Sequence, residues 1–174
     1  MAKFHFNNLD EDVRALMVEE IQLDIDESKL YESARLNSFG ASNYSDYLLQ
    51  SAKKGDEEAF ELLLDINTCF NPNDLSKGKP SKMPKNSSKL LCQSEFNRFY
   101  IRAVCRKSIL DDKEFVEVYR ARESSWSRPE SEAKIGVQMS AQELLDDLRS
   151  SIGDTPKLLP DLNSGLSVML VDNE

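Results

Sequence analysis

Residues 94–107 read SEFNRFYIRAVCRK and form the clearest helical pattern in the chain. The apolar residues recur at the spacing of one helix face: Phe96, Phe99, Tyr100, Ala103 and Val104. On another side, Arg98, Arg102 and Arg106 recur every four residues, and each such step advances only about 40° around a helix. The pattern predicts a helix over residues 95–109 with one core face and one basic stripe.

The residues after this helix predict a small sheet. Residues 115–122 are rich in β-branched and aromatic side chains, which indicates a strand, and residues 137–139 indicate a shorter one. A capping box of Ser140 and Glu143 opens a helix expected over residues 141–151. Residues 166–171 predict a last strand. Residues 94–174 therefore predict a small α+β domain with the order helix, strand, strand, helix, strand.

The residues before the arginine helix predict a helical, acidic region at positions 1–70. Asp10 is a candidate cap for a helix near residues 11–37, Ser42 or Asn43 for a helix that ends at Gly55, and Asp56 for a third. The same stretch does not indicate whether these helices pack on the α+β part or move separately.

Residues 71–93 predict a basic arm rich in proline, lysine and serine. The segment holds five lysines and three prolines, and no hydrophobic period is present between Leu75 and Leu90. Prolines spaced in this way favour extended structure. The alternatives are an arm that lies along another surface and a solvated flexible loop.

Charge is sorted along the chain. Residues 67–110 carry nine Lys and Arg against two Asp and Glu, within a chain of net charge −9. A basic block of this kind can meet a polyanion, an acidic partner, or acidic parts of its own chain or of a neighbouring copy. For the arginine stripe, a solvated face or pairing with the acidic N-terminal helices is favoured over partner contact. The overall charge argues against a dedicated duplex-binding protein.

Composition indicates the cellular compartment and the cofactors to expect. No apolar run approaches the ~20 residues that span a bilayer, and no secretory signal is visible at the N-terminus, so no membrane partner is expected. Cys69, Cys92 and Cys105 are widely spaced, which favours a reduced, cytoplasmic setting. With a single histidine and no cysteine pair, neither a metal nor another cofactor is expected.

Two short motifs suggest enzymes. Glu132-Ala133-Lys134 matches half of a Mg²⁺-dependent nuclease site, where the carboxylate holds the metal and the lysine stabilises charge on the phosphate. The missing acid could come from Asp111, Asp112 or Glu114. Glu130 and Glu132 also match the paired glutamates of ADP-ribosyl transfer, but the accompanying arginine and Ser-x-Ser elements are not in workable order. Such motifs arise often by chance in a chain with 30% charged residues, so we expect a non-enzymatic protein.

Four segments resemble a family of small uncharacterised proteins in bacterial and phage genomes. They are SEFNRFYIR at 94–102, VYRAR at 118–122, RPESE at 128–132 and GLSV at 165–168, and the resemblance covers roughly residues 80–170. It implies a phage-encoded protein, with a virion component as the candidate. No activity is known for the family, so it implies no catalytic residue.

These observations together predict a non-enzymatic interaction or assembly protein, most concretely a phage or prophage structural component. It would contact neighbouring subunits, including copies of itself, and lie in the host cytoplasm or within a virion. Trp126, in a polar loop, is either an interface anchor or a side chain folded back over the sheet. The predicted contact residues are Lys82, Lys85, Lys89, Arg98, Arg102, Arg106 and Trp126. Nucleic-acid binding through the same basic segment is the first alternative, and the nuclease is the second.

Overall fold

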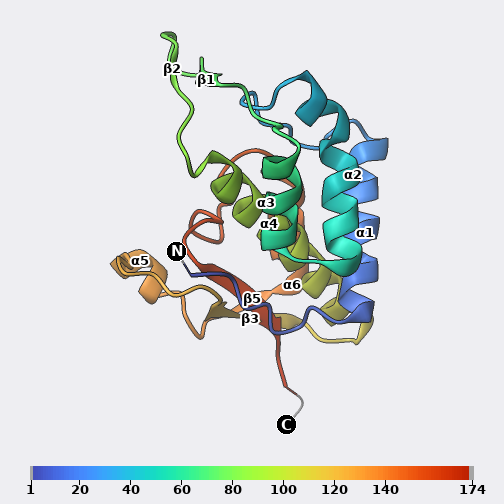
Figure 1. Cartoon of the computed structure of the whole chain (residues 1–174). Coiled ribbons are helices and arrows are strands. Elements are labelled where there is room, and N and C mark those ends of the chain that lie inside the picture. Colours follow the sequence, from blue (N-terminus) through green and yellow to red (C-terminus); the bar gives the residue numbers. More distant parts are fainter. Residues whose placement is uncertain (1, 173–174) are drawn as a thin grey trace.

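The helix α4, Ser87–Leu110, runs through the centre of the molecule (Figure 1). The structure is a computed structural model and describes residues 2–172. Helices that precede and follow α4 in the sequence, and a small sheet, all pack against it. As a result most of its residues are buried, polar ones included. The sequence predicts residues 95–109 of this helix but not its first eight residues, and it predicts only one core face.

Three helices precede α4, and each begins at a side-chain cap. They are α1 (Glu11–Asp26), α2 (Ser38–Lys54) and α3 (Glu57–Ile66). The side chains of Asp10, Asn37 and Asp56 each accept one hydrogen bond, from the backbone N–H of the residue three positions later. This bond satisfies a donor that the helix itself leaves free. The predicted caps at Asp10 and Asp56 are confirmed.

The first two helices have other bounds than predicted. α1 ends at Asp26, and Ser28 at a φ of 56° directs the chain away from the helix axis, so residues 27–37 form a loop. α2 begins at Ser38, before both predicted caps, because Asn37 is also fixed by donating to the carbonyl oxygen of Thr68 at 2.6 Å. Gly40 lies inside α2, and a Cβ there would collide with the backbone of Cys69.

The basic arm is a hairpin followed by the start of α4. Strands β1 (Asn73–Asp74) and β2 (Ser81–Lys82) pair antiparallel, and their turn projects away from the rest of the chain (Figure 1). The predicted arm ends at 93, whereas the observed one ends at 86. Residues 87–93, the last seven of the predicted arm, form the first two turns of α4, because Leu91 and Cys92 are buried against the core there.

The sheet has three antiparallel strands in the order β4-β3-β5. They are β3 (Phe115–Arg120), β4 (Gln138–Ser140) and β5 (Leu166–Leu170). Val116 of β3 pairs with Met139 of β4 and Leu170 of β5. The helix α6 (Ala141–Ser150) follows β4, and its cap is the predicted one, since the hydroxyl of Ser140 accepts the N–H of Glu143 at 3.2 Å. A further single turn, α5 (Pro129–Glu132), lies in the loop before β4.

One hydrophobic core joins all parts of the chain. Its buried residues run from Val13 in α1 to Val168 in β5 without a break into separate clusters. The N-terminal helices therefore pack on the α+β part and share its core. The predicted α+β class is confirmed, with more helix than strand.

Candidate functional site

The arginine stripe of α4 lies mostly inside the molecule. Arg102 is completely buried, and its guanidinium donates to the Glu20 carboxylate at 2.9 Å and to both carboxylate oxygens of Asp24 at 2.8 and 2.9 Å. Arg149 of α6 binds the same Glu20 carboxylate at 2.7 and 2.9 Å. Burial opposes ionisation of Glu20, but hydrogen bonds from the two arginines outweigh it and lower the pKa of Glu20. Arg102, Arg149, Glu20 and Asp24 thus connect α1, α4 and α6, and Arg106 approaches the Glu20 carboxylate more loosely, at 3.5 Å.

Arg98 and Arg106 lie on either side of this network. Arg98 is only 3% exposed and donates to the carbonyl oxygen of Asp154 at 2.8 Å. Arg106 is partly exposed and binds Glu19 at 2.7 Å. Burial leaves Arg102 no surface for the predicted partner contact, whereas Arg98, although buried, lines a pocket. The favoured alternative, pairing with the acidic N-terminal helices, holds for Arg102 and Arg106.

The exposed part of the basic block is the hairpin. Lys77, Lys79, Lys82 and Lys85 are exposed. Among residues 2–172, no carboxylate lies within ion-pair distance of any of them. Lys89, by contrast, is half-buried on the first turn of α4. Among the predicted contact residues, Arg98 and Arg102 are therefore buried and Lys82 and Lys85 exposed, with Arg106 and Lys89 between these extremes.

Trp126 lies in the loop before α5 and is 85% exposed. It lines an open hollow of about 560 Å³ together with Arg128 and Glu130. Its side chain is therefore not folded back over the sheet, which was one of the two alternatives for this residue. It remains a predicted contact residue.

The residues of the nuclease motif have other partners. The Glu132 carboxylate binds the guanidinium of Arg120 at 2.7 Å. Within the described part of the chain, no group of three or more His, Cys, Asp or Glu side chains is placed to hold a metal ion. No observation therefore adds to the nuclease alternative.

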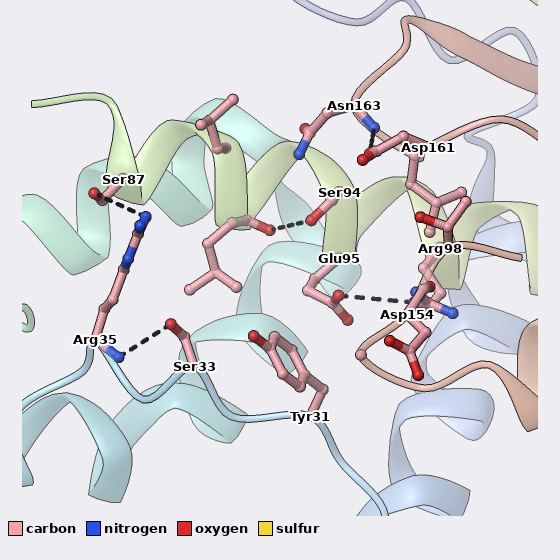
Figure 2. Close-up of a pocket in the computed structure, with 15 residues that line it drawn as sticks. Tyr31, Ser33, Arg35, Ser87, Ser94, Glu95, Arg98, Asp154, Asp161 and Asn163 are labelled. Carbon is pink, nitrogen blue, oxygen red and sulfur yellow. Dashed lines mark hydrogen bonds and ion pairs between the residues drawn. The ribbon is translucent and has the colours of Figure 1, made fainter. Parts of the chain in front are cut away.

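A polar pocket of about 260 Å³ lies where three segments meet (Figure 2). Its walls are the loop at residues 31–35, the N-terminal half of α4, and the loop at residues 153–163 after α6. Its polar lining includes Tyr31, Arg35, Ser94, Glu95, Arg98 and Asp154. The pocket draws on all three regions that the sequence separates.

Glu95 is the most perturbed carboxyl group of this pocket. Its side chain is about 5% exposed, and its nearest cation is the Nε of Arg98 at 3.7 Å. Burial raises the pKa of Glu95 to about 7; Arg98 and Arg102 oppose this rise, and Asp24 adds to it. Titratable groups with such shifts, placed in a pocket, are frequent at binding and catalytic sites.

The Glu95→Gln variant should be less sensitive to pH than the natural protein. Because the folded-state pKa of Glu95 is raised from 4.5 to about 7, the folded state binds the proton more tightly than the unfolded state. The stabilisation that comes from protonating Glu95 in the folded state is fully present below pH 4.5 and is lost as pH rises through 7. We expect this group to lower the free energy of unfolding by about 2 kcal/mol between pH 5 and pH 7.

Urea unfolding of both proteins at pH 5, 6, 7 and 8 measures this difference. The glutamine variant should lack that part of the pH dependence and be the more stable protein at pH 8. Parallel pH profiles for the two proteins would contradict the prediction. An Asp46→Asn variant is the control, because that carboxylate lies exposed on α2 outside the pocket.

Glu95 carries a signal in the sequence that its helical spacing alone does not reveal. Residues 67–110 hold two acids, Asp74 and Glu95, among nine cations. Both are buried, and each pairs with an arginine that lines the pocket, Asp74 with Arg35 at 2.9 Å and Glu95 with Arg98. An acid isolated within a basic block is thus the feature that marks this site.

Comparison of the chain with protein-family models, curated proteins and solved structures finds no match. Among the described residues, no helix has the length and apolar character that a membrane span requires.

Proposed function

We propose that this protein is a non-enzymatic assembly protein, a phage or prophage structural component, whose β1–β2 hairpin docks on an acidic surface of a neighbouring subunit. The observation that supports it is the hairpin itself. Its four exposed lysines have no intramolecular ion pair among residues 2–172, and they project from a chain of net charge −9. Oppositely charged surfaces accelerate association and select partners.

The outer face of α3 in a second copy is the surface that suits the hairpin. Leu62 and Ile66 are 58% and 68% exposed there, and Glu58 and Asp65 are exposed on the same side of the helix. The hairpin offers the complement, with Leu75 67% exposed among its lysines. Both surfaces thus expose apolar side chains, and the positive charge of the hairpin is opposite to the negative charge of α3.

Such a contact is heterologous, since the hairpin and α3 are different parts of the molecule. Heterologous contacts build rings or open filaments rather than closed dimers of one patch. Repeated structures of this kind suit a virion component. Trp126 is a second contact residue in this proposal, because exposed tryptophans are frequent anchors of interfaces.

The Lys82→Gln, Lys85→Gln double variant should form smaller assemblies than the natural protein. Light scattering at low and high salt measures the mass, and an absorbance ratio reports bound nucleic acid. The proposal expects an oligomer that is free of nucleic acid and dissociates as salt rises, because screening weakens exposed charge pairs. Leu62→Ser on the opposite surface should reduce the mass in the same way.

The matched control is the Lys53→Gln, Lys54→Gln variant, which removes two exposed lysines of α2 outside both surfaces. It should leave the mass unchanged. A monomer at every salt concentration would overturn the proposal. A monomer that carries nucleic acid, and loses it in the Lys82 and Lys85 variant, would establish the nucleic-acid alternative instead.

A further inference from the structure

We propose that the pocket between residues 31–35, α4 and residues 153–163 binds a small organic cation, an ammonium or guanidinium compound, with Glu95 as its counter-ion. This inference is independent of the hairpin contact, since none of the hairpin lysines lines the pocket. It rests on which polar groups of the pocket already have partners, on the aromatic wall, and on the burial of Glu95.

The cations of the pocket already have partners. Arg35 binds the carboxylate of Asp74 at 2.9 Å and the hydroxyl of Ser87 at 3.4 Å. The two terminal nitrogens of Arg98 donate to the carbonyl oxygen of Asp154 at 2.8 Å, and to the carbonyl oxygen of Leu148 and the hydroxyl of Ser151 at 3.4 Å. Its Nε has no hydrogen-bond partner, but it is buried and lies 3.7 Å from the Glu95 carboxylate. An anionic ligand would compete with these bonds.

The Glu95 carboxylate has open acceptor positions. Glu95 is nine-tenths buried and, within the described chain, accepts no hydrogen bond shorter than its 3.7 Å approach to Arg98. Figure 2 shows its carboxylate directed into the space between Tyr31 and Asp154. A buried carboxylate without donors is unfavourable, and a ligand that brings positive charge and N–H donors removes this cost.

Tyr31 supplies an aromatic wall beside this carboxylate. Its ring packs on Gly153, where an added Cβ would lie 2.9 Å from ring atom Cδ2, and Gly153 has a φ of 78° that favours glycine. The ring is therefore held in place by the loop after α6. Cations are attracted to the faces of aromatic rings, so an ammonium or guanidinium group between Tyr31 and Glu95 gains from both.

Binding of a cation requires the ionised form of Glu95, and the surrounding groups set when it forms. Arg98 and Arg102 of α4 favour ionisation, Asp24 of α1 opposes it, and the buried phenol of Tyr44 in α2 is uncharged because burial raises its pKa. Asp154 adds negative charge at the pocket wall. With the pKa of Glu95 about 7, affinity for a cation should increase about tenfold from pH 6 to pH 8.

The test is an NMR titration of the ¹⁵N-labelled full chain with methylguanidinium chloride and with methylammonium chloride, at pH 6 and pH 8. Inorganic phosphate is the probe of opposite charge. We expect at least one cation to shift the amide signals of residues 94–98 and 153–155, with about tenfold tighter binding at pH 8. Glu95→Gln should weaken binding at least tenfold at pH 8 and remove its pH dependence, and Asp154→Asn should weaken it less. Asp46→Asn should bind as the natural protein does.

Three outcomes would overturn the proposal. One is the absence of saturable shifts with either cation. Another is binding that Glu95→Gln leaves unchanged although the variant gives the dispersed spectrum of a folded chain. The third is saturable binding of phosphate at these same amides with no response to the cations, which would make Arg35 and Arg98 the ligands.

Discussion

The Arg102→Met variant should lose about 3 to 5 kcal/mol of unfolding free energy, the cost typical of breaking a buried ion pair by removing one partner. Methionine fills much of the same volume, so packing changes little. Glu20 and Asp24, however, remain buried at 1% and 3% exposure, and the guanidinium that donates three short hydrogen bonds to them is gone. Urea unfolding at pH 7, followed by circular dichroism, measures the loss.

Two further variants separate this effect from loss of charge in general. Arg106→Gln removes an arginine of the same helix whose main partner, Glu19, is exposed, and should cost less than about 1 kcal/mol. Adding Glu20→Gln and Asp24→Asn to Arg102→Met removes the uncompensated charges and should recover part of the loss. A cost for Arg102→Met no larger than that of Arg106→Gln would contradict the account of the network.

The Gly40→Ala variant should be destabilised by about 3 kcal/mol, as expected for overpacking at a rigid site. Helix propensity alone predicts the opposite sign, a gain of about 1 kcal/mol for alanine over glycine inside a helix. Here the new Cβ would collide with the carbonyl oxygen of Cys69 and lie 2.9 Å from its Cβ. That carbonyl is held by the N–H of Asn37 at 2.8 Å, so it cannot move without breaking the start of α2.

The control is Ser42→Ala, an exposed position one half-turn later in the same helix, which should be neutral or slightly stabilising. Thermal unfolding of the three proteins, followed by circular dichroism, distinguishes the two accounts. A Gly40→Ala variant with a higher midpoint than the natural protein would show that the loop at Cys69 yields easily.

The elements that the sequence predicts well are those with local signals. The caps at Asp10, Asp56 and Ser140 depend on a side chain and a backbone group three residues apart, and all three are present as expected. The strand at β3 is equally local, since alternate residues Val116 and Val118 face the core. The starts of these helices agree with the structure and β3 ends two residues before the predicted strand, whereas α1 ends at Asp26, well before its predicted end near residue 37.

The start of α2 and the start of α4 could not be placed from such signals. Asn37 caps α2 through the N–H of Gly40, and Thr68, thirty-one residues away, additionally fixes its amide. The first turns of α4 contain Ser87, Ser88 and Lys89, which indicate a loop by composition, yet the two serines are buried by packing. In both cases tertiary contacts outweigh local propensity.

In the candidate site, too, local patterns are visible in the sequence and tertiary contacts are not. Periodicity places Arg98 and Arg102 on one side of a helix correctly, but it does not show that other elements cover that side. Glu95 could be recognised only by the contrast with its basic neighbours, and its surroundings come from loops distant in sequence. The exposed lysines lie in the segment that composition alone predicts to be a basic arm, and their contact with a partner stays a prediction.

The central position of α4 has a consequence for synthesis of the chain on the ribosome. Arg102 contacts Glu20 and Asp24, which emerge long before it, whereas Arg149 and β5 emerge after it. A nascent chain that stops near residue 140 would hold the network without one of its two arginines and β3 without the partner strand β5. Folding therefore awaits the emergence of residues 141–170, and until then the apolar surface of α4 is accessible to chaperones.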